Sequence, residues 1–290
     1  MLCPVCLVLC PVRSWRSVME LREAEIKQVS EALFSNQSLL VLGEPGSGKS
    51  TLGEAVKRRL GADRWSVAMA SYNGSAKECL VLIAEQLGVS TMTLDEKPKA
   101  LTAAQLREAL TKRLTRKRTV LICDDAHRWS ASLRYWLEDV LRAEGVLLLL
   151  VASPCPPKEL FVKMPRIELP LIRDEDIRKL MMTEAESYGI QLVASEVAEL
   201  QQRSGNNPAL AKRVIRETVL GISETATGDH YQYIDGTPFL IGLISLIGII
   251  RFAGLGMGDK VLYVLGGIIT LIAVTLRGLL YAANRGRRRL

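Results

Sequence analysis

The chain has 290 residues, enough for one medium-sized domain with a sizeable core and a small addition. Its formal net charge of +7 lies almost entirely after residue 237, where seven Lys and Arg face a single acid, Asp259. The first 237 residues therefore carry a net charge of only about +1, which argues against a basic surface for binding nucleic acid. The hydrophobic content is also concentrated near the C-terminus, because residues 238–281 are nearly all apolar.

Residues 1–17 are interpreted as an N-terminal extension, either a short peripheral anchor or residues ahead of the true domain start. They contain three closely spaced cysteines, Cys3, Cys6 and Cys10. These supply only three thiolates in an apolar setting, so a metal site is not expected there. The apolar run precedes the first basic residue, Arg13, which is the reverse of the order in a secretory signal peptide.

From residue 18 onward, helical and strand-like segments alternate. Apolar positions recur at helical spacing over 18–34, and short apolar runs bounded by turn residues predict strands. The predicted strands are 39–42, 65–70, 119–125, 146–153 and 166–170, and the predicted helices between them are 51–60, ended by Gly61, 76–87, 102–114 and 132–143. Strands that are apolar on both faces and bounded by helices indicate a parallel sheet covered on both sides. We therefore expect an α/β core over residues 18–172.

The part of the chain that follows the core is expected to be helical. Two or three helices are predicted between Asp174 and Thr218, without further strands, and are interpreted as a small lid subdomain over 173–220. Residues 221–237 are polar and rich in turn-forming residues, so they are interpreted as a linker.

A glycine-rich turn stands between the first predicted strand and the next helix. It reads Gly43, Glu44, Pro45, Gly46, Ser47, Gly48, Lys49 and Ser50, followed by Thr51, and fits the phosphate-loop pattern G-x-x-x-x-G-K-[ST] without a gap. Glycines let successive backbone N–H groups turn inward around a phosphate, and the helix adds its positive N-terminal end. Lys49 supplies a charge to the β- and γ-phosphates, and the Ser50 hydroxyl binds Mg²⁺. The sequence therefore predicts an ATP and Mg²⁺ site.

The third predicted strand ends in two acids, 75 residues after Lys49. Asp124 can hold Mg²⁺ through water beside Ser50, and Asp125 would orient the attacking water. Either acid could instead belong to a solvated turn or cap a helix. His127 could sense the nucleotide or pack against its neighbours, and the packing role is favoured.

With these motifs, residues 20–220 resemble AAA+ ATPases of the ExeA-like type found in secretion operons and the TniB-like type found in transposition operons. The matching segments, in the family's order, are GEPGSGKST, CLVLIAEQLGV, LICDDAH, LLLLVAS, IELPLIRDEDIRKLM and SGNNPALAKRVI. The resemblance implies ATP hydrolysis and homo-oligomers, because sites in this family usually form between subunits. It also implies that Ser153 contacts the γ-phosphate or the water, with a turn role before Pro154 as the alternative. The second acid in active members is usually Glu, whereas Asp125 is one methylene shorter.

The segment from Gly205 to Leu210 looks like the G-x-P motif that also occurs in signalling NTPases of the STAND group. By this resemblance, Pro208 would approach the adenine or the ribose. ExeA-like chains usually carry a basic residue directly after the proline. Here that residue is Ala209, so Arg213 on the next turn is the candidate lid cation.

Two apolar runs within 238–281 predict a transmembrane helical hairpin. The second run, from Val261 to Leu276, has 16 uncharged residues, which approaches the ~20 needed to cross a bilayer. Five arginines end or follow it, so the positive-inside rule places the basic tail, 282–290, in the cytosol. Two spans return the chain to the side on which it started, so the ATPase part is expected in the cytosol as well, at the inner membrane. The alternative is a buried helical hairpin in a soluble protein.

The leading interpretation is a membrane-anchored ATPase that uses ATP and Mg²⁺ to drive or regulate a membrane-associated complex of the secretion or assembly type. The expected partners are ATP, the lipid bilayer, further copies of the chain and a membrane or secretion-complex protein. A STAND-like nucleotide switch at the membrane is a second hypothesis. A DNA-associated ATPase of the transposition type is a third, although the near-neutral charge of the first 237 residues argues against a nucleic-acid partner.

Overall fold

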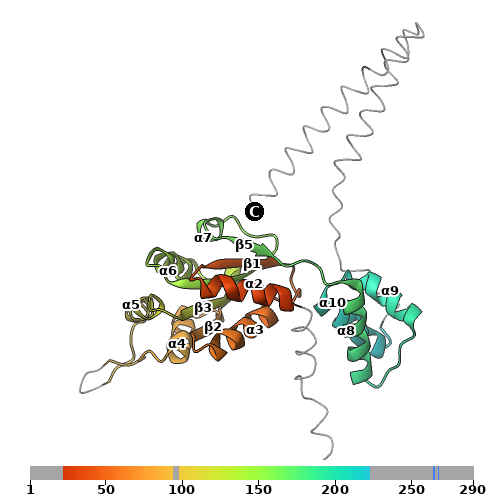
Figure 1. Cartoon of the computed structure of the whole chain (residues 1–290), viewed down its shortest axis with the longest axis horizontal. Coiled ribbons are helices and arrows are strands. Elements are labelled where there is room, and N and C mark those ends of the chain that lie inside the picture. Colours follow the sequence, from red (N-terminus) through yellow and green to blue (C-terminus); the bar gives the residue numbers. More distant parts are fainter. Residues whose placement is uncertain (1–21, 94–97, 223–263, 265–266, 268–290) are drawn as a thin grey trace, which may run out of the picture. The chain divides into compact units, whose positions relative to one another are not determined.

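A computed structural model describes residues 22–93 and 98–222, together with positions 264 and 267 (Figure 1). Its centre is a parallel five-stranded sheet in the order β2-β3-β4-β1-β5. The strands are β1 (Leu39–Gly43), β2 (Ser66–Ser71), β3 (Thr119–Asp124), β4 (Val146–Ala152) and β5 (Arg166–Glu168). The predicted parallel α/β sheet is therefore confirmed, with strand boundaries within about two residues of the expected ones.

The chain order and the spatial order of the strands differ, and this difference shapes the site. β4 lies between β1 and β3, so that Gly43 at the end of β1 is beside Ala152 and Cys123 on β3 is beside Leu149. Because all strands are parallel, their carboxyl ends lie along one edge of the sheet. The ends of β1, β3 and β4, which carry the predicted site residues, are therefore neighbours.

Helices cover both faces of the sheet (Figure 1). On one face α2 (Glu23–Phe34) and α3 (Lys49–Ala62) pack on Val41 and on alternate residues of β3 and β4. On the other face α4 (Ala76–Leu87), α5 (Ala103–Leu114), α6 (Ala131–Arg142) and the short α7 (Glu159–Val162) pack around Leu40 and Leu42. Successive residues of β1 thus point into opposite cores, which explains why the strand is apolar without alternation.

Local signals set several helix ends. Ser75 caps α4 by accepting a hydrogen bond from Glu78 N, and Gly88 ends it in the left-handed conformation. Thr102 begins α5 with a reciprocal capping box. The helix after the glycine-rich turn was expected to end at Gly61, but α3 runs one residue further, to Ala62. Sequence analysis did not predict α7 or the 3₁₀ turn η2 (Ala126–Arg128), because both are too short to show a period.

Three helices follow the sheet, namely α8 (Asp174–Ser187), α9 (Ala194–Ser204) and α10 (Pro208–Val219). They surround a separate small core in which Ile177, Val197 and Ile215 are buried. The predicted lid helices are therefore present, and they bury their own apolar faces.

Several predicted segments lie outside the described residues. These are the N-terminal extension 1–17, most of the linker 221–237, the hairpin 238–281 apart from positions 264 and 267, and the tail 282–290. The chain divides into two compact units, Met1–His230 and Tyr231–Leu290, and the elements named above belong to the first. Within the part of the chain that the structure describes, no helix has both the length and the apolar character needed to cross a membrane.

Candidate functional site

The glycine-rich turn joins β1 to α3 and requires glycine at specific positions. Gly46 and Gly48 have φ angles of 81° and 92°, in the left-handed region that side chains disfavour. An ideal Cβ on Gly43 would lie 2.6 Å from Ser47 Oγ, so the loop folds back closely over its own start. The sequence motif is thus a tight backbone turn in the structure, with Ser47 buried inside it.

The start of α3 presents backbone N–H groups beside this turn. The first intrahelical bond runs from Leu52 N to Gly48 O, at 2.9 Å. The amides of Gly48, Lys49, Ser50 and Thr51 therefore have no acceptor inside the helix. Together with the helix dipole, these N–H groups favour an anion at this end of α3.

Lys49 is buried, with a side chain only 6% exposed, and it lies against the loop. Its Nζ donates to the carbonyl oxygens of Gly43 and Glu44, at 3.0 and 2.8 Å. Burial lowers the pKa of Lys49, and the charges of Asp125, Asp124 and Glu44 act in the opposite direction. The ammonium is therefore held inside the loop and within electrostatic reach of both acids at the end of β3.

The acidic end of β3 is held by hydrogen bonds from the turn that follows it. Asp124 Oδ1 accepts a hydrogen bond from Asp125 N at 3.0 Å, and Trp129 Nε1 donates to the Asp124 backbone oxygen at 2.9 Å. Asp125 has φ 46° and ψ 43°, an uncommon conformation for a residue other than glycine. Its Oδ2 lies 3.7 Å from Nη1 of Arg128. Asp124 thus sits at the strand end, and Asp125 is turned out of the strand.

The end of β4 is hydrogen-bonded to the end of β1 and to the turn that follows β3. Ser153 N donates to Gly43 O at 2.9 Å, which places Ser153 directly beside the start of the loop. Ala152 N donates to Nδ1 of His127 at 3.4 Å, so His127 connects η2 to β4. Burial lowers the pKa of His127, against a smaller opposite effect of Asp125, and this favours the neutral ring that the hydrogen bond requires.

The lid touches the loop directly. Asn207 Nδ2 donates to Pro45 O at 2.8 Å, and Ala209 N donates to Gly46 O at 3.3 Å. The Asn207 side chain also caps α10, since its Oδ1 accepts from Ala209 N at 3.1 Å. An ideal Cβ on Gly46 would lie 2.8 Å from this same Oδ1. Asn207 was not among the predicted site residues, although an Asn directly before a proline is a typical start of a helix.

The two residues predicted for the lid differ in position. Pro208 is buried at the first position of α10, next to the loop contact made by Asn207. Arg213 is exposed further along the same helix, and its Nε donates to Glu217 Oε1 at 2.7 Å. Glu217 also pairs with Arg203 at 3.2 Å. The ion pair of Arg213 is therefore within the lid.

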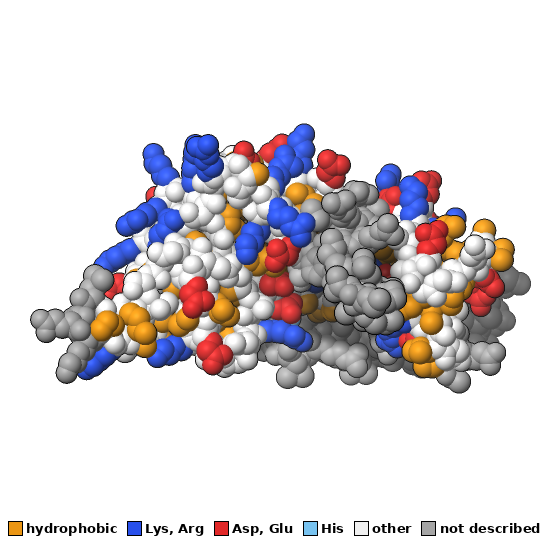
Figure 2. Space-filling view, turned by 90° about the horizontal axis from the view of Figure 1, so that it is seen from below, with side chains coloured by type: hydrophobic (Ala, Val, Ile, Leu, Met, Phe, Trp, Pro, Cys, Tyr) orange, Lys and Arg blue, Asp and Glu red, His pale blue; other side chains and the backbone are white. Residues whose placement is uncertain are grey.

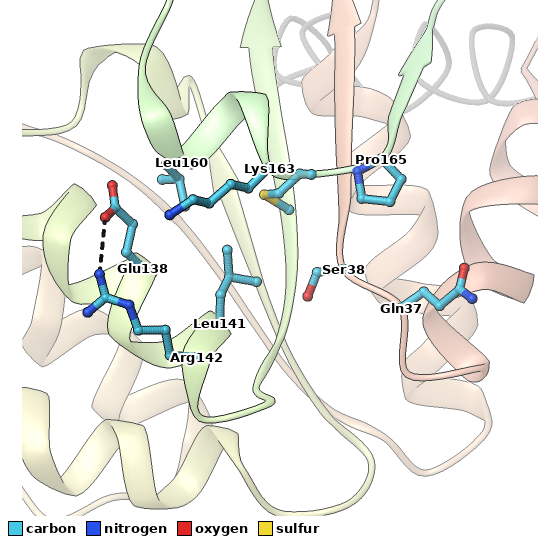
Figure 3. Close-up of a pocket in the computed structure, with 9 residues that line it drawn as sticks. Gln37, Ser38, Glu138, Leu141, Arg142, Leu160, Lys163 and Pro165 are labelled. Carbon is cyan, nitrogen blue, oxygen red and sulfur yellow. Dashed lines mark ion pairs between the residues drawn. The ribbon is translucent and has the colours of Figure 1, made fainter.

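A cavity of about 560 Å³ lies at a different place, beside the residues that precede β1 and β5 (Figure 3). Ser38 and Pro165 line it at the amino ends of these strands, and Glu138 and Arg142 on α6 pair across 3.8 Å at its rim. In parallel α/β sheets the functional groups converge outside the carboxyl ends of the strands. We therefore place the candidate site at the opposite edge from this cavity, at the glycine-rich loop.

Charges on the surface are mixed in sign. Figure 2 shows Lys and Arg side chains interspersed with Asp and Glu on the face that it presents. This distribution agrees with the near-neutral balance of the first 237 residues.

Comparison with known protein families gives a match for the part of the chain that contains the glycine-rich loop. Residues 32–160 match the family model described as AAA domain. No curated protein matches the chain.

Solved structures give only weak similarities. A structure described as a DNA replication initiation factor has a TM-score of 0.48 and 15% identity, over 80% of this chain and 70% of that one. AMPPCP-bound DnaA from Aquifex aeolicus has a TM-score of 0.47 and 14% identity, with the same coverage. The Thermotoga maritima RuvB branch migration motor has a TM-score of 0.43 and 16% identity, over 72% of this chain and 65% of that one. Likenesses this low do not transfer a function. Residues 32–160 therefore match an AAA domain, and the parallel sheet and the phosphate-loop motif agree with that match.

Proposed function

We propose that this chain binds ATP with Mg²⁺ and hydrolyses it. The observation that carries the proposal is the convergence of Lys49, Asp124 and Ser153 at one edge of the sheet. A buried ammonium, a helix start with unpaired N–H groups and a carboxylate at the neighbouring strand end are the parts that phosphoryl transfer requires. The residues present therefore suit a nucleoside triphosphate.

Each residue has a separate part in the proposed reaction. The loop from Gly43 to Gly48 encloses the phosphates with its backbone N–H groups, and Lys49 neutralises their charge. The Ser50 hydroxyl and the Asp124 carboxylate are the oxygen donors that Mg²⁺ prefers, and the ion would offset charge between the β- and γ-phosphates.

The acid proposed to orient the attacking water is Asp125. Its backbone conformation turns the side chain away from β3, and the carboxylate is 43% exposed. Ser153, one residue beyond β4, supplies a hydroxyl at the same edge, which we propose contacts the γ-phosphate or the water. Because Asp125 is shorter than Glu, we expect turnover to be slow.

The lid would contact the other end of the nucleotide. We propose that Pro208 packs against the adenine or the ribose, because it is adjacent to the contact between Asn207 and the loop. Arg213 remains the candidate lid cation, with a smaller part, because its guanidinium is already bonded to Glu217.

The membrane role rests on the sequence of residues 238–281. We propose that this segment forms a two-helix anchor in the inner membrane, with the AAA+ domain and the basic tail in the cytosol and with several copies assembling around a secretion-type or assembly-type complex. The AAA+ domain would then drive or regulate that complex.

A nucleotide-dependent switch is the second candidate, and one observation favours it. The lid is bonded to the loop through Asn207 and Ala209, so occupancy of the loop and the position of the lid would be coupled. In a switch, bound nucleotide would change the assembly of the chain, and slow hydrolysis would reset it.

Turnover of ATP by the full-length chain in detergent tests the proposal. We expect magnesium-dependent phosphate release that Lys49→Ala abolishes. Asp125→Asn should reduce it by about a hundredfold or more, because a positioned general base typically contributes about 10²–10⁴-fold. Asp125→Glu should retain or increase the rate. Phosphate release that persists in Lys49→Ala would show that the loop is not the site.

A further inference from the structure

A buried arginine lies behind the glycine-rich loop and outside the motif that defines it. Arg22 immediately precedes α2 and is only 3% exposed. Its Nη2 donates to the backbone oxygen of Ser47 at 3.2 Å, across 25 residues of sequence. Its Nη1 donates to Glu25 Oε1 at 3.1 Å, and this carboxylate is itself mostly buried. Burial of a guanidinium has a large desolvation cost, so the hydrogen bonds of Arg22 to Ser47 and Glu25 are needed to offset it.

The backbone group that Arg22 holds belongs to the peptide between Ser47 and Gly48. A trans peptide is planar, and its C=O and N–H point in opposite directions. A donor that fixes the carbonyl of Ser47 therefore also fixes the direction of the Gly48 N–H. This N–H is one of the amides at the start of α3 that have no acceptor within the helix.

The plane of the Ser47–Gly48 peptide could also rotate easily. Gly48 has a φ of 92°, and glycine adopts positive and negative φ at similar energy. Rotation of the Ser47–Gly48 peptide would replace an inward N–H by an inward carbonyl oxygen, which repels phosphate. A charged donor on the outer side of the loop opposes this rotation, because hydrogen bonds from a guanidinium are stronger than those between neutral groups.

The surroundings keep the guanidinium in place. Glu25 lies one turn along α2 and pairs with Nη1, while Nη2 reaches the loop, so the two sides of the fork have different partners. Nε of Arg22 has no hydrogen-bond partner within the described part of the chain. A lysine could donate to Ser47 O but lacks a planar fork that reaches Glu25 as well.

From this geometry we infer that Arg22 is a positioning residue for nucleotide binding: it fixes the Ser47–Gly48 peptide so that the Gly48 N–H faces the phosphates. The inference rests on the proposed function, because it assumes that the loop receives a nucleotide. It adds a residue outside the phosphate-loop motif that sets the affinity for the phosphate tail.

The test is made on the full-length chain in detergent, with a fluorescent ADP analogue as probe and ATP turnover as a second measurement. We expect Arg22→Gln to weaken ADP binding about tenfold, as loss of one charge-assisted hydrogen bond predicts. We also expect KM for ATP to rise while kcat at saturation changes little, and Arg22→Lys to restore part of the affinity. Lys27→Gln is the matched control on the same helix, because Lys27 is exposed and pairs only loosely with Glu31, at 3.9 Å.

Other outcomes separate this inference from the proposed function. If Lys49→Ala abolishes ADP binding while Arg22→Gln and Arg22→Lys bind as the unchanged chain does, the inference is overturned and the proposed function stands. If the unchanged chain itself does not bind ADP, the proposed function fails first. Should Arg22→Gln not fold, Glu25→Gln leaves Arg22 in place but removes its ion pair, and it must still weaken ADP binding by a smaller factor. Unaltered binding in a folded Glu25→Gln variant would then overturn the inference.

Discussion

The two halves of the candidate site are built in different ways. The half on the sheet consists of strand ends and one loop, whose places follow from parallel pairing of β1, β4 and β3. The half on the lid consists of the start of α10, which has a separate core and meets the loop through Asn207 and Ala209. The sheet half is therefore fixed by the main core of the domain, whereas the lid half depends on a few polar contacts.

This difference indicates which part of the site can respond to a ligand. Moving the loop would disturb two buried strands and α3, but moving α10 requires the loss of only a few hydrogen bonds to Pro45 and Gly46. Regions with few buried contacts open at a lower free-energy cost. We expect the lid to be the adjustable half, and the following predictions test this division from the largest effect to the smallest.

The largest effect is expected where the two halves touch. Gly46→Ala should reduce the free energy of unfolding by about 2–3 kcal/mol, because it adds left-handed strain and places a Cβ 2.6 Å from Ala209 Cβ. Gly74→Ala is the matched control, since Gly74 also has a positive φ but a Cβ there would meet nothing within 4 Å. It should cost only about 1 kcal/mol. If urea unfolding showed the same loss of unfolding free energy in Gly46→Ala and in Gly74→Ala, the lid would not rest on the loop.

Asn207→Ala should have a smaller effect on stability together with an effect on binding. Loss of the cap of α10 should lower the free energy of unfolding by about 1 kcal/mol, and loss of the hydrogen bond to Pro45 should lower it somewhat further. Ser75→Ala removes the equivalent cap of α4, far along the chain from the lid. Both variants should lower the thermal midpoint, but only Asn207→Ala should change the affinity for ADP. A change of ADP affinity in both would contradict a specific contact between lid and loop.

The sheet half should show a pH dependence through His127. Burial holds the pKa of this ring below its ordinary value, so the unfolded chain binds the proton more readily. The free energy of unfolding should therefore fall as the pH drops below about 6.5 and continue to fall until the pH reaches the folded-state pKa. The bond from Ala152 N to Nδ1 is lost on the same titration. His127→Gln should flatten this dependence in urea unfolding between pH 8 and 5.5, and identical slopes would contradict it.

The smallest effect is expected in the lid at Arg213. Its ion pair with Glu217 is half exposed, so Arg213→Ala should lower the free energy of unfolding by less than about 0.5 kcal/mol. It should lower ADP affinity only slightly, in keeping with the small part proposed for Arg213. Arg203→Ala should cost more, because the Arg203 side chain is only 20% exposed where it pairs with the same carboxylate. A marked loss of ADP affinity in Arg213→Ala, measured by titration, would show instead that this arginine is a principal nucleotide contact.

The sequence predicted the parts of the fold and site that depend on local patterns. The apolar strands and the loop from Gly43 to Ser50 could be located because each is a short continuous signal. The sequence also predicted that Asp124 lies near the loop, since the carboxyl ends of parallel strands lie along one edge of the sheet. The predicted stop of the helix at Gly61 differs from the observed end of α3, at Ala62, by one residue, which is within the usual spread of helix boundaries.

The contacts that sequence analysis missed join residues far apart in the chain. Asn207 reaches Pro45 across 162 positions, Arg22 reaches Ser47 across 25, and His127 meets Ala152 across 25. Each uses a common polar side chain whose local pattern indicates only a helix start or a turn. Their partners are backbone atoms, which leave no mark in the sequence.

The central claim is that the loop and Lys49 enclose a nucleotide's phosphates. Titration calorimetry of the full-length chain with a non-hydrolysable ATP analogue and magnesium tests it most directly. The account predicts saturable binding with one site per chain, which is lost in Lys49→Ala although that variant still unfolds in a cooperative thermal transition. Absence of binding by the unchanged chain at millimolar analogue, or equal binding by Lys49→Ala, would contradict it.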